Sequence, residues 1–395
     1  MAGAARRPLL RRLQPARALA SLRARLRGRR GALPARLARR GLVWRAGEPS
    51  GRIGAAGENG ENLARIALLT GGSTPERDVA LAGAAQVAPA LRSLGHLVTV
   101  IDTTEGALEP EREGEMLDPS IRREPPSSER LRDLARRENL PRLVAEPAIA
   151  GADLVFLVLH GDQGEGGSLQ ALLDLTGRRY TGSDALGSGL AMDKEVGKRL
   201  LAQARLPQAP WVRWPAEAAD LEPLGLPCVV KPSRAGSSVG VSVVHAAAEL
   251  PAAVAAALEV DREVLVEGFL PGREFSVGVL GERALAVGEI VPRHEIFDYE
   301  CKYTPGMCRE IFPAEIAPAL AERMQELALA THRALKLRDF SRVDLKLSAD
   351  GTPCVLEANT LPGMTRGSLL PQSAAAVGIG FVELCAELCA LALAR

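Results

Sequence analysis

Asp344, Glu357 and Asn359 are three oxygen-bearing side chains within the short stretch from Ser341 to Thr365. Two carboxylates and an amide oxygen are ligands that a hard divalent cation such as Mg²⁺ prefers. The stretch therefore predicts a metal site, provided that its fold brings the three side chains together. A solvated hairpin face with an accidental pairing is the other interpretation, because a β-bulge would change which residues face each other.

The same stretch predicts a β-hairpin that would bring them together. Polar Arg342 and Asp344 alternate with apolar residues, as expected of a β-strand. Asp350-Gly351 favours a two-residue type I′ turn, because both positions tolerate φ > 0. With that turn, residues whose numbers sum to 701 face each other, so Asp344 faces Glu357 and Arg342 faces Asn359. Opposed carboxylates are destabilising in a bare sheet, which again favours a bound cation.

Two lysines near a loop of small residues form a second candidate site. Lys231 ends an apolar segment, and the loop Ser233 to Val241 follows almost directly. Small residues let a backbone wrap around an anion, and Lys194 and Lys231 would add positive charge for phosphates. Because the lysine precedes the glycines, this is not a Walker A loop, and it is not a G-x-G-x-x-G loop either. A surface hairpin remains the alternative.

Glu267 and Glu274 flank a Pro-Gly turn between two apolar segments. A hinge here could place Glu267 against a purine edge and Glu274 against ribose hydroxyls, although both could equally be charges at strand ends. Phe297 to Tyr303 contains three Phe or Tyr residues in a chain with 3% aromatic residues. This segment predicts a loop that folds over a site.

His160 follows an apolar strand expected from Asp153 to Leu159. Loops at the carboxyl ends of parallel strands are where sites assemble, so His160 is a candidate ligand or acid–base group. A histidine that only shapes its own loop by hydrogen bonding is the alternative.

The elements that must position these residues indicate an α/β fold. A buried strand at 63–69, a glycine-rich turn, a helix from about 75 to 94 and a strand at 96–101 form a βαβ pattern, which predicts a parallel sheet. Residues 103–150 predict a charged surface excursion with short helices at 131–137 and 140–144. Further helices are expected from 194 to about 205, at 315–337 and at 380–395.

Length and composition are those of a globular protein with two or three domains. The chain has 395 residues, of which 47% are hydrophobic. It has no run of about 18 apolar residues, so no membrane span is expected. Six cysteines without a C-x-x-C pair suggest reduced, cytosolic usage, and Cys385 and Cys389 share one helix face as core residues.

Charge is distributed unevenly along the chain. Residues 1–52 contain fifteen arginines, no lysine and one acid, a net +14, so the remainder carries −13 within the overall +1. We expect residues 1–62 to be a disordered extension. It could be an organellar transit peptide, a segment that binds nucleic acid or an anionic surface, or the result of a start codon placed too far upstream, which we favour.

Several of these motifs, in this order, resemble the D-alanine–D-alanine ligase family of the ATP-grasp superfamily. They are GGSTPERDVAL, HGDQGEGG, VVKPSRAGSSVGV, FDYECKY, FSRVDLKL and LEANTLPGMT, and the resemblance covers about 63–395. It implies an N-terminal parallel-sheet domain at 63–182 for substrate binding and two α+β domains, 183–266 and 267–395, that clamp ATP. A departure is that Gly268 and Phe269 stand where the adenine wall is often Lys and Trp.

The resemblance also implies roles for individual residues. Glu76 would orient the ammonium of the first D-alanine and, with Ser237 and Tyr303, hold the loops closed over it. Arg342 and the backbone of Gly363 would stabilise the oxyanion. The ATP-site residues would be Lys194, Lys231, Glu267, Leu270, Glu274 and Lys302. His160 would lie near the first D-alanine, and Ser368 and Leu369 near the carboxylate of the second. The ligands of two Mg²⁺ ions, which Mn²⁺ can replace, would be Asp344, Glu357 and Asn359.

The activity implied is ATP-dependent formation of D-alanyl-D-alanine through an acyl phosphate, for peptidoglycan precursor synthesis. The resemblance further implies a cytoplasmic homodimer that contacts through its first domain, with no nucleic-acid or membrane partner. Tyr303 favours an amine over D-lactate as the second substrate. The alternatives are an ATP-grasp ligase with another acceptor, and a nucleotide-binding regulatory protein without catalysis.

Overall fold

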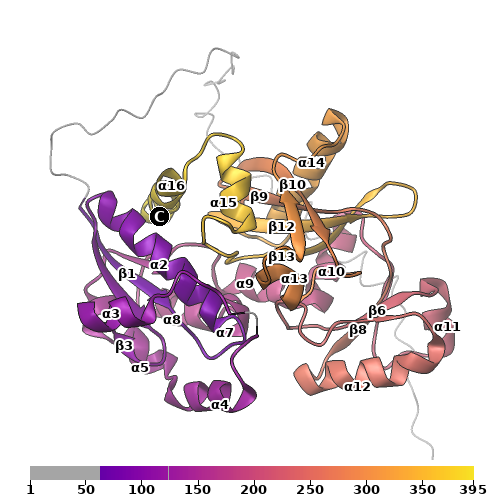
Figure 1. The fold of residues 1–395 in the computed structure, drawn as a ribbon, viewed down its shortest axis with the longest axis horizontal. Helices are drawn as coiled ribbons and strands as arrows, with labels where there is room; N and C mark the ends of the chain where they lie inside the picture. Colours follow the sequence, from indigo (N-terminus) through magenta and orange to yellow (C-terminus); the bar gives the residue numbers. More distant parts are fainter. Residues whose placement is uncertain (1–62, 123) are drawn as a thin grey trace, which may run out of the picture. The chain divides into compact units, whose positions relative to one another are not determined.

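The computed structural model describes residues 63–122 and 124–395. Residues 1–62 lie outside the described part, and with them the predicted extension and its three interpretations. The described residues belong to one unit, Gly60–Arg395. Three sheets organise it (Figure 1).

The first sheet has the strand order β3-β2-β1-β4. Its strands β1, β2 and β4 are parallel, which confirms the predicted parallel sheet, and only the short β3 runs antiparallel to β2. Nearly all of β1 and all of β4 are buried, as expected for a parallel sheet covered on both faces. The elements are β1 (Arg65–Thr70), α2 (Arg77–Ser93), β2 (Leu97–Asp102), β3 (Gly106–Ala107) and β4 (Leu154–Leu157).

The excursion between β3 and β4 is more helical than its sequence indicated. The two predicted helices are present, and Asn139 caps the second by accepting a hydrogen bond from the Arg142 N–H at 3.0 Å. The helices of this segment are α3 (Pro110–Met116), α4 (Ser128–Arg137), α5 (Leu140–Val144) and α6 (Pro147–Ala150). Two helices follow β4, namely α7 (Gly161–Glu165) and α8 (Ser168–Leu175).

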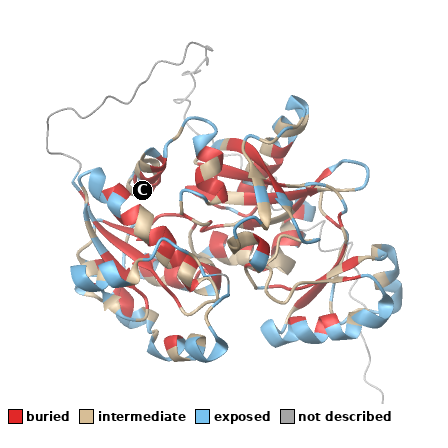
Figure 2. Ribbon diagram, viewed as in Figure 1, coloured by how far each residue is buried: buried red, intermediate tan, exposed pale blue. Residues whose placement is uncertain are grey.

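The central sheet has the order β5-β8-β6-β7, and all of its strands are antiparallel. One face packs on α12 through Val230, Val254, Ala257 and Val266, and the outer faces of α11 and α12 are exposed (Figure 2). The elements are α9 (Ala185–Met192), α10 (Lys194–Gln203), β5 (Trp211–Arg213), α11 (Ala218–Leu221), β6 (Cys228–Pro232), β7 (Ser242–Val244), α12 (Leu250–Val260) and β8 (Val264–Gly268), with 3₁₀ turns at Glu222–Leu224 and Ala247–Glu249.

The third sheet is antiparallel, with the order β11-β10-β9-β12-β13. Its strands are β9 (Glu274–Leu280), β10 (Arg283–Pro292), β11 (Cys308–Ile311), β12 (Phe340–Leu347) and β13 (Pro353–Asn359). The helices of this part are α13 (Tyr299–Tyr303), α14 (Pro318–Ala334), α15 (Leu369–Ala375) and α16 (Phe381–Leu393). The segment predicted as a loop at 297–303 thus contains the short helix α13, which Asp298 caps through the Cys301 N–H at 2.9 Å.

Alternation along β12 separates its core residues from its polar residues. Val343 and Leu345 are fully buried in a core with Met324 and Leu327 of α14. The intervening side chains of Arg342, Asp344 and Lys346 therefore point to the opposite face of the sheet. The apolar contacts with α14 thus determine which way the charged residues point.

The hairpin pairs the predicted residues, but its loop is longer than predicted and one strand contains a bulge. Ser348 N–H donates to Thr352 O at 2.9 Å, so the loop is Ala349–Gly351, with three residues, and of these only Gly351 has positive φ. The predicted two-residue type I′ turn is therefore wrong. A bulge at Leu356 on β13, opposite Asp344 and Leu345, then shifts the register back, so that Arg342 still pairs with Asn359 and Asp344 with Glu357.

The C-terminal helix α16 packs on the first sheet and on α2, although the two regions are far apart in the sequence (Figure 1). Cys385 and Cys389 lie in the same core as Ile66 and Leu91, which confirms that they are core residues. Among the described residues, no helix is both long enough and apolar enough to cross a membrane.

Candidate active site

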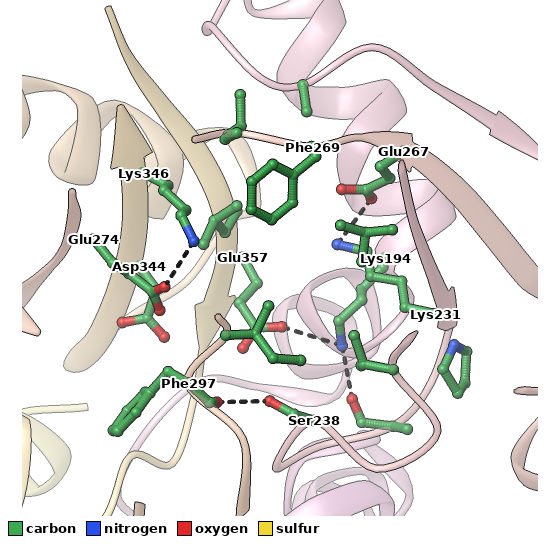
Figure 3. Close-up of a pocket in the computed structure, with 18 of the residues that line it drawn as sticks. Lys194, Lys231, Ser238, Glu267, Phe269, Glu274, Phe297, Asp344, Lys346 and Glu357 are labelled. Carbon is green, nitrogen blue, oxygen red and sulfur yellow. Dashed lines mark hydrogen bonds and ion pairs between the residues drawn. The ribbon is translucent and has the colours of Figure 1, made fainter. Parts of the chain in front are cut away.

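The first of two adjoining pockets lies between the central and third sheets (Figure 3). It encloses about 950 Å³, counting the solvent at its mouth, which is ample for a nucleotide. Apolar side chains, including Phe269 and Leu270, form one part of its wall and charged side chains form the other. All six predicted ATP-site residues line it, together with two predicted metal ligands: Lys194, Lys231, Glu267, Leu270, Glu274, Lys302, Asp344 and Glu357.

Lysine–carboxylate pairs hold the charged wall in place (Figure 3). Lys194 Nζ lies 3.2 Å from Glu357 Oε2 and donates to Ala235 O at 2.8 Å. Lys231 Nζ lies 2.8 Å from Glu267 Oε1, and the buried Lys198 lies 3.2 Å from the same oxygen. Glu267 is therefore a counter-ion for two lysines, and it also lines the pocket, so its predicted position against a purine edge stays a prediction.

Asp344 is the most heavily hydrogen-bonded carboxylate of the site. Arg342 donates to it through Nε at 2.9 Å and Nη2 at 2.7 Å, and Ser276 Oγ donates at 2.8 Å. Asn359 Nδ2 donates to Asp344 Oδ2 at 3.0 Å. The side chain of Asn359 is therefore within reach of Asp344, as the predicted pairing requires.

The ionisation state of Glu357 supports metal binding by Asp344, Glu357 and Asn359. Burial alone would raise the pKa of Glu357, but the surrounding Lys194, Lys302, Lys231 and Arg342 lower it to about 2. The carboxylate is thus ionised at neutral pH. The buried carboxylate of Asp344, the half-buried carboxylate of Glu357 and the amide of Asn359 form an all-oxygen donor set that fits Mg²⁺ or Mn²⁺.

The second pocket lies between the first sheet's loops and the third sheet. It shares Ser237, Phe297 and Lys302 with the first pocket, so the two meet at these residues. Every remaining predicted residue lines it: Glu76, His160, Tyr303, Arg342, Asn359, Gly363, Ser368 and Leu369. The structure therefore brings together all of the predicted positions, while their individual roles stay predictions.

Glu76, Ser237 and Tyr303 meet at the junction of three loops. Ser237 Oγ donates a hydrogen bond to Glu76, and it lies 3.5 Å from the Tyr303 hydroxyl. Burial raises the pKa of Tyr303, so its phenol stays protonated and able to donate. Ser237 and its neighbour Ser238 have φ of 49° and 58°. A strained left-handed conformation in two successive serines is typical of a functional loop.

His160 and Glu165 lie beneath this pocket. His160 Nδ1 contacts Leu361 O at 3.0 Å, whereas its buried Nε2 has no hydrogen-bond partner among the described residues. Burial lowers the pKa of His160, so the imidazole is neutral. Glu165 accepts the N–H groups of Thr360 and Leu361 at 3.1 and 3.0 Å, and burial raises its pKa to about 7.

Gly363 and Ser368 form the far end of the second pocket. A Cβ at Gly363 would lie 2.8 Å from Ser368 Oγ, so a glycine is needed for the backbone to approach so closely. Ser368 Oγ accepts the Thr365 N–H at 3.1 Å. It precedes α15, whose first backbone N–H groups are free to face an anion.

Sequence reasoning left three charged lining residues without a role, namely Lys346, Glu165 and Glu310. Lys346 continues the polar face of β12, and its alternation with Arg342 and Asp344 was a usable signal. Phe269 lies under Lys346, with the ammonium 5.3 Å from the ring centroid. Glu165 and Glu310 come from elements far away in the sequence, and no local pattern marks them.

Solved structures with a similar fold include a nucleotide complex. An ATP complex of D-alanine--D-alanine ligase from Bacillus anthracis superposes with a TM-score of 0.68 at 28% identity, covering 84% of this chain and 98% of that one. The VanG D-Ala:D-Ser ligase from Enterococcus faecalis gives 0.69 at 29% identity, covering 84% and 99%. Fold and pockets together define an ATP-grasp protein.

Matches to family models show which family of ATP-grasp proteins the chain belongs to. The model for the D-ala D-ala ligase N-terminus matches residues 65–183, and the model for the C-terminus matches 200–390. The chain therefore belongs to the D-alanine–D-alanine ligase family. Similar relatives include the D-alanine--D-alanine ligases of Desulfotalea psychrophila, 41% identical over 84% of this chain and 95% of that protein, and Geotalea uraniireducens, 40% identical over 83% and 95%.

Proposed function

We propose that this chain joins two molecules of D-alanine into D-alanyl-D-alanine, converting ATP to ADP and phosphate. One observation carries the proposal: a nucleotide-sized pocket meets a polar pocket at Ser237, Phe297 and Lys302. A phosphoryl group held in the first pocket is thus within reach of a carboxylate held in the second. The product would supply peptidoglycan precursors.

The first step activates a carboxylate. Glu76 pairs with the ammonium of the first D-alanine, and the carboxylate of that substrate attacks the terminal phosphoryl group of ATP. An acyl phosphate and ADP result. Lys194, Lys231 and Lys302 offset the negative charge of the transferred group, which is the main task in phosphoryl transfer.

The second step forms the peptide bond. The carboxylate of the second D-alanine binds near Ser368 and Leu369, and its amine attacks the acyl carbon. Arg342 and the Gly363 N–H stabilise the oxyanion, and phosphate leaves. The amine loses a proton in this step. His160, whose neutral ring has an Nε2 without a partner among the described residues, lines the pocket proposed for the first substrate.

Asp344, Glu357 and Asn359 would hold two Mg²⁺ ions, for which Mn²⁺ can substitute. Bound there, the ions would polarise the phosphoryl oxygens and neutralise their charge. The residues themselves supply the oxygen donors and are held in place by Arg342, Ser276 and Lys194.

Water exclusion is the task of the segment around α13. An acyl phosphate hydrolyses in water, so it must form in a closed site. Ser238 Oγ donates to Phe297 O at 2.9 Å, and Ser237 lies beside Tyr303, so the 233–241 loop and the α13 segment hold each other over both pockets.

Three further features are part of the proposal. We propose a division into domains at 63–182, 183–266 and 267–395, which the presence of three sheets supports, although the second boundary falls within β8. A homodimer would form through the first domain, where Leu94 and Leu97 are exposed. A cytoplasmic location agrees with six free cysteines. Sedimentation velocity of the full chain measures the oligomeric state.

Phosphate release from Mg²⁺-ATP tests the function directly. We expect release by the full chain to require D-alanine and not to occur with L-alanine, and mass spectrometry to detect the dipeptide. Stimulation by a different amino acid would replace the substrate but keep the ATP-grasp chemistry. ATP binding without any turnover would favour the regulatory alternative.

Tyr303 bears on the choice of nucleophile. We propose that the enzyme selects the amine of D-alanine over the hydroxyl of D-lactate. Competition between the two at neutral pH is the test, and equal incorporation of D-lactate would contradict the assignment.

A further inference from the structure

His294, Asp298 and Cys301 form a cluster that lines neither pocket. One nitrogen, one oxygen and one sulfur, each from a different residue, all lie within 4.8 Å of one another. His294 Nδ1 is 2.7 Å from Asp298 Oδ2. Among residues 63–122 and 124–395, this is the group of three His, Cys, Asp or Glu side chains whose donor atoms converge in this way.

The chain positions the three donors around one turn. Asp298 uses its other oxygen to cap α13, accepting the Cys301 N–H at 2.9 Å, so its carboxylate faces both Cys301 and His294. Cys301 is 2% exposed, and the backbone amides of His294 and Arg293 lie against its sulfur. Burial and the neighbouring Asp298 carboxylate raise the pKa of the Cys301 thiol, so an ion that binds here displaces the thiol proton, because the thiolate is the form that ligates a metal. His294 is exposed, so an ion can enter from solvent.

The donor set selects a class of metal. A thiolate, an imidazole and a carboxylate are ligands of Zn²⁺, whereas Mg²⁺ prefers oxygen alone. Ligand atoms on a tetrahedral Zn²⁺ are roughly 3.3–3.8 Å apart, given bonds of about 2.0–2.3 Å. Donors already within 4.8 Å need only a small movement to reach that spacing.

A neighbouring pair provides a contrast. His245 Nε2 lies 3.0 Å from Glu295 Oε2 and is also exposed. This pair has the same imidazole–carboxylate chemistry, and its Glu295 directly follows His294 in the chain, but no thiol converges on it among the described residues. Two donors make an ordinary surface pair, and the sulfur of Cys301 is what distinguishes the cluster.

We propose that His294, Asp298 and Cys301 bind a thiophilic divalent cation of the Zn²⁺ class, with the fourth position open to water. The ion would join the end of β10 to α13. Lys302 and Tyr303 follow Cys301 directly and line the pockets. A bound ion would therefore hold the segment that covers the pockets in its closed position and slow turnover, a consequence that rests on the proposed function.

Cobalt binding tests the site without reference to activity. Co²⁺ is added to the metal-free full chain without ATP, and the thiolate-to-cobalt charge-transfer absorption is recorded. We expect one equivalent to produce the band. His294→Gln and Cys301→Ser should each weaken binding by more than about tenfold, because even losing a residue that only supports a ligand costs 10–100-fold. His245→Gln is the matched control and should bind like the parent chain.

Two results would overturn the site. One is the absence of the band in the parent chain, and the other is a band that survives Cys301→Ser, because the thiolate would then belong to another cysteine. Cys301 is buried, so Cys301→Ser could weaken cobalt binding by disturbing the fold. His294→Gln changes an exposed side chain, so weaker cobalt binding in that variant reports loss of a ligand. Circular dichroism confirms that each variant is folded.

Zn²⁺ titration of D-alanine-dependent phosphate release tests the effect on the covering segment. At saturating Mg²⁺-ATP, we expect micromolar Zn²⁺ to lower kcat severalfold in the parent chain and in His245→Gln, and to leave His294→Gln active. Equal inhibition of all three would place the inhibitory Zn²⁺ at the Asp344 group or on ATP and overturn the regulatory role. Failure of the proposed function would remove turnover altogether while leaving the cobalt result intact.

Discussion

Ser237 donates a hydrogen bond to Glu76 across 161 positions of sequence. The donor belongs to the loop after β6 in the central sheet, and the acceptor precedes α2 beside the first sheet. Both residues line the second pocket, so this contact joins two parts of its wall. A hydroxyl in a strained backbone thus holds the carboxylate that is proposed to bind the substrate ammonium.

Removing that hydroxyl should impair use of the first D-alanine. We expect Ser237→Ala to lower kcat/KM for D-alanine about 10- to 100-fold, because a hydrogen bond to a charged group contributes about 1.5–3 kcal/mol. Steady-state kinetics at saturating ATP is the measurement.

Ser238→Ala is the matched control, since Ser238 has a similar positive φ and donates to the neutral Phe297 O. Alanine would adopt a similar positive φ at both positions, so the backbone strain is comparable in the two variants. A loss about as large in Ser238→Ala would show that loop strain, and not the Glu76 contact, determines activity.

Arg342 should require its guanidinium shape as well as its charge. Burial opposes its charge, but Asp344 and Glu357 raise its pKa, so it stays cationic. Arg342→Lys keeps the charge and loses the two-point contact with Asp344. We expect kcat to fall by about 10²–10³, the usual loss for one oxyanion donor.

Arg273→Lys provides the comparison. Arg273 makes an equivalent two-point pair with Glu289, at 2.5 and 2.6 Å, in the same sheet but outside both pockets. Its kcat should stay within about threefold of the parent value. Unchanged kcat in Arg342→Lys would remove Arg342 from the oxyanion role.

Asp344→Asn should change the metal requirement. Replacing one carboxylate of the donor set weakens the binding of a hard cation, so the Mg²⁺ concentration for half-maximal activity should rise more than about tenfold. The readout is phosphate release against free Mg²⁺ at fixed ATP. Ser276→Ala, which loses only the 2.8 Å hydrogen bond to Asp344, should shift it less. A parent-like Mg²⁺ curve for Asp344→Asn would contradict its assignment as a ligand.

His332 should make the fold sensitive to acid. It is buried on α14, with Nδ1 2.8 Å from Ser341 Oγ, and burial lowers its pKa from 6.5 to about 4. A lowered folded-state pKa means that its stability contribution is complete above pH 6.5 and is lost as pH falls towards 4. By pH 5 the loss should reach about 2 kcal/mol.

Urea unfolding at pH 7 and pH 5 measures this loss. His332→Asn keeps a polar atom near the Nδ1 position but does not titrate. The parent chain should lose about 2 kcal/mol more than the variant between the two pH values. Equal losses would show that other groups cause the acid sensitivity.

The hairpin shows how far local sequence reasoning reached. Alternation along β12 and the pairing of Asp344 with Glu357 were predictable, but the turn was not. A three-residue loop moved the register by one, and the bulge near Asp344 moved it back. Neither the longer loop nor the bulge is marked in the sequence, and their effects on the register cancel. They cancel because burial of Val343 and Leu345 against α14 holds the polar face of β12 towards the pockets.

The sequence by itself determined the α/β class, the parallel first sheet and the set of predicted site residues, all of which line the two pockets. These follow from periodicity and from motifs whose members are close in the chain. Only the tertiary structure decided that Glu267 is a counter-ion for Lys198 and Lys231, that α16 completes the core of the first sheet, and that Glu165 supports Thr360 and Leu361. Each of these depends on the distance between segments remote in sequence, which packing of the whole chain sets and no local pattern records.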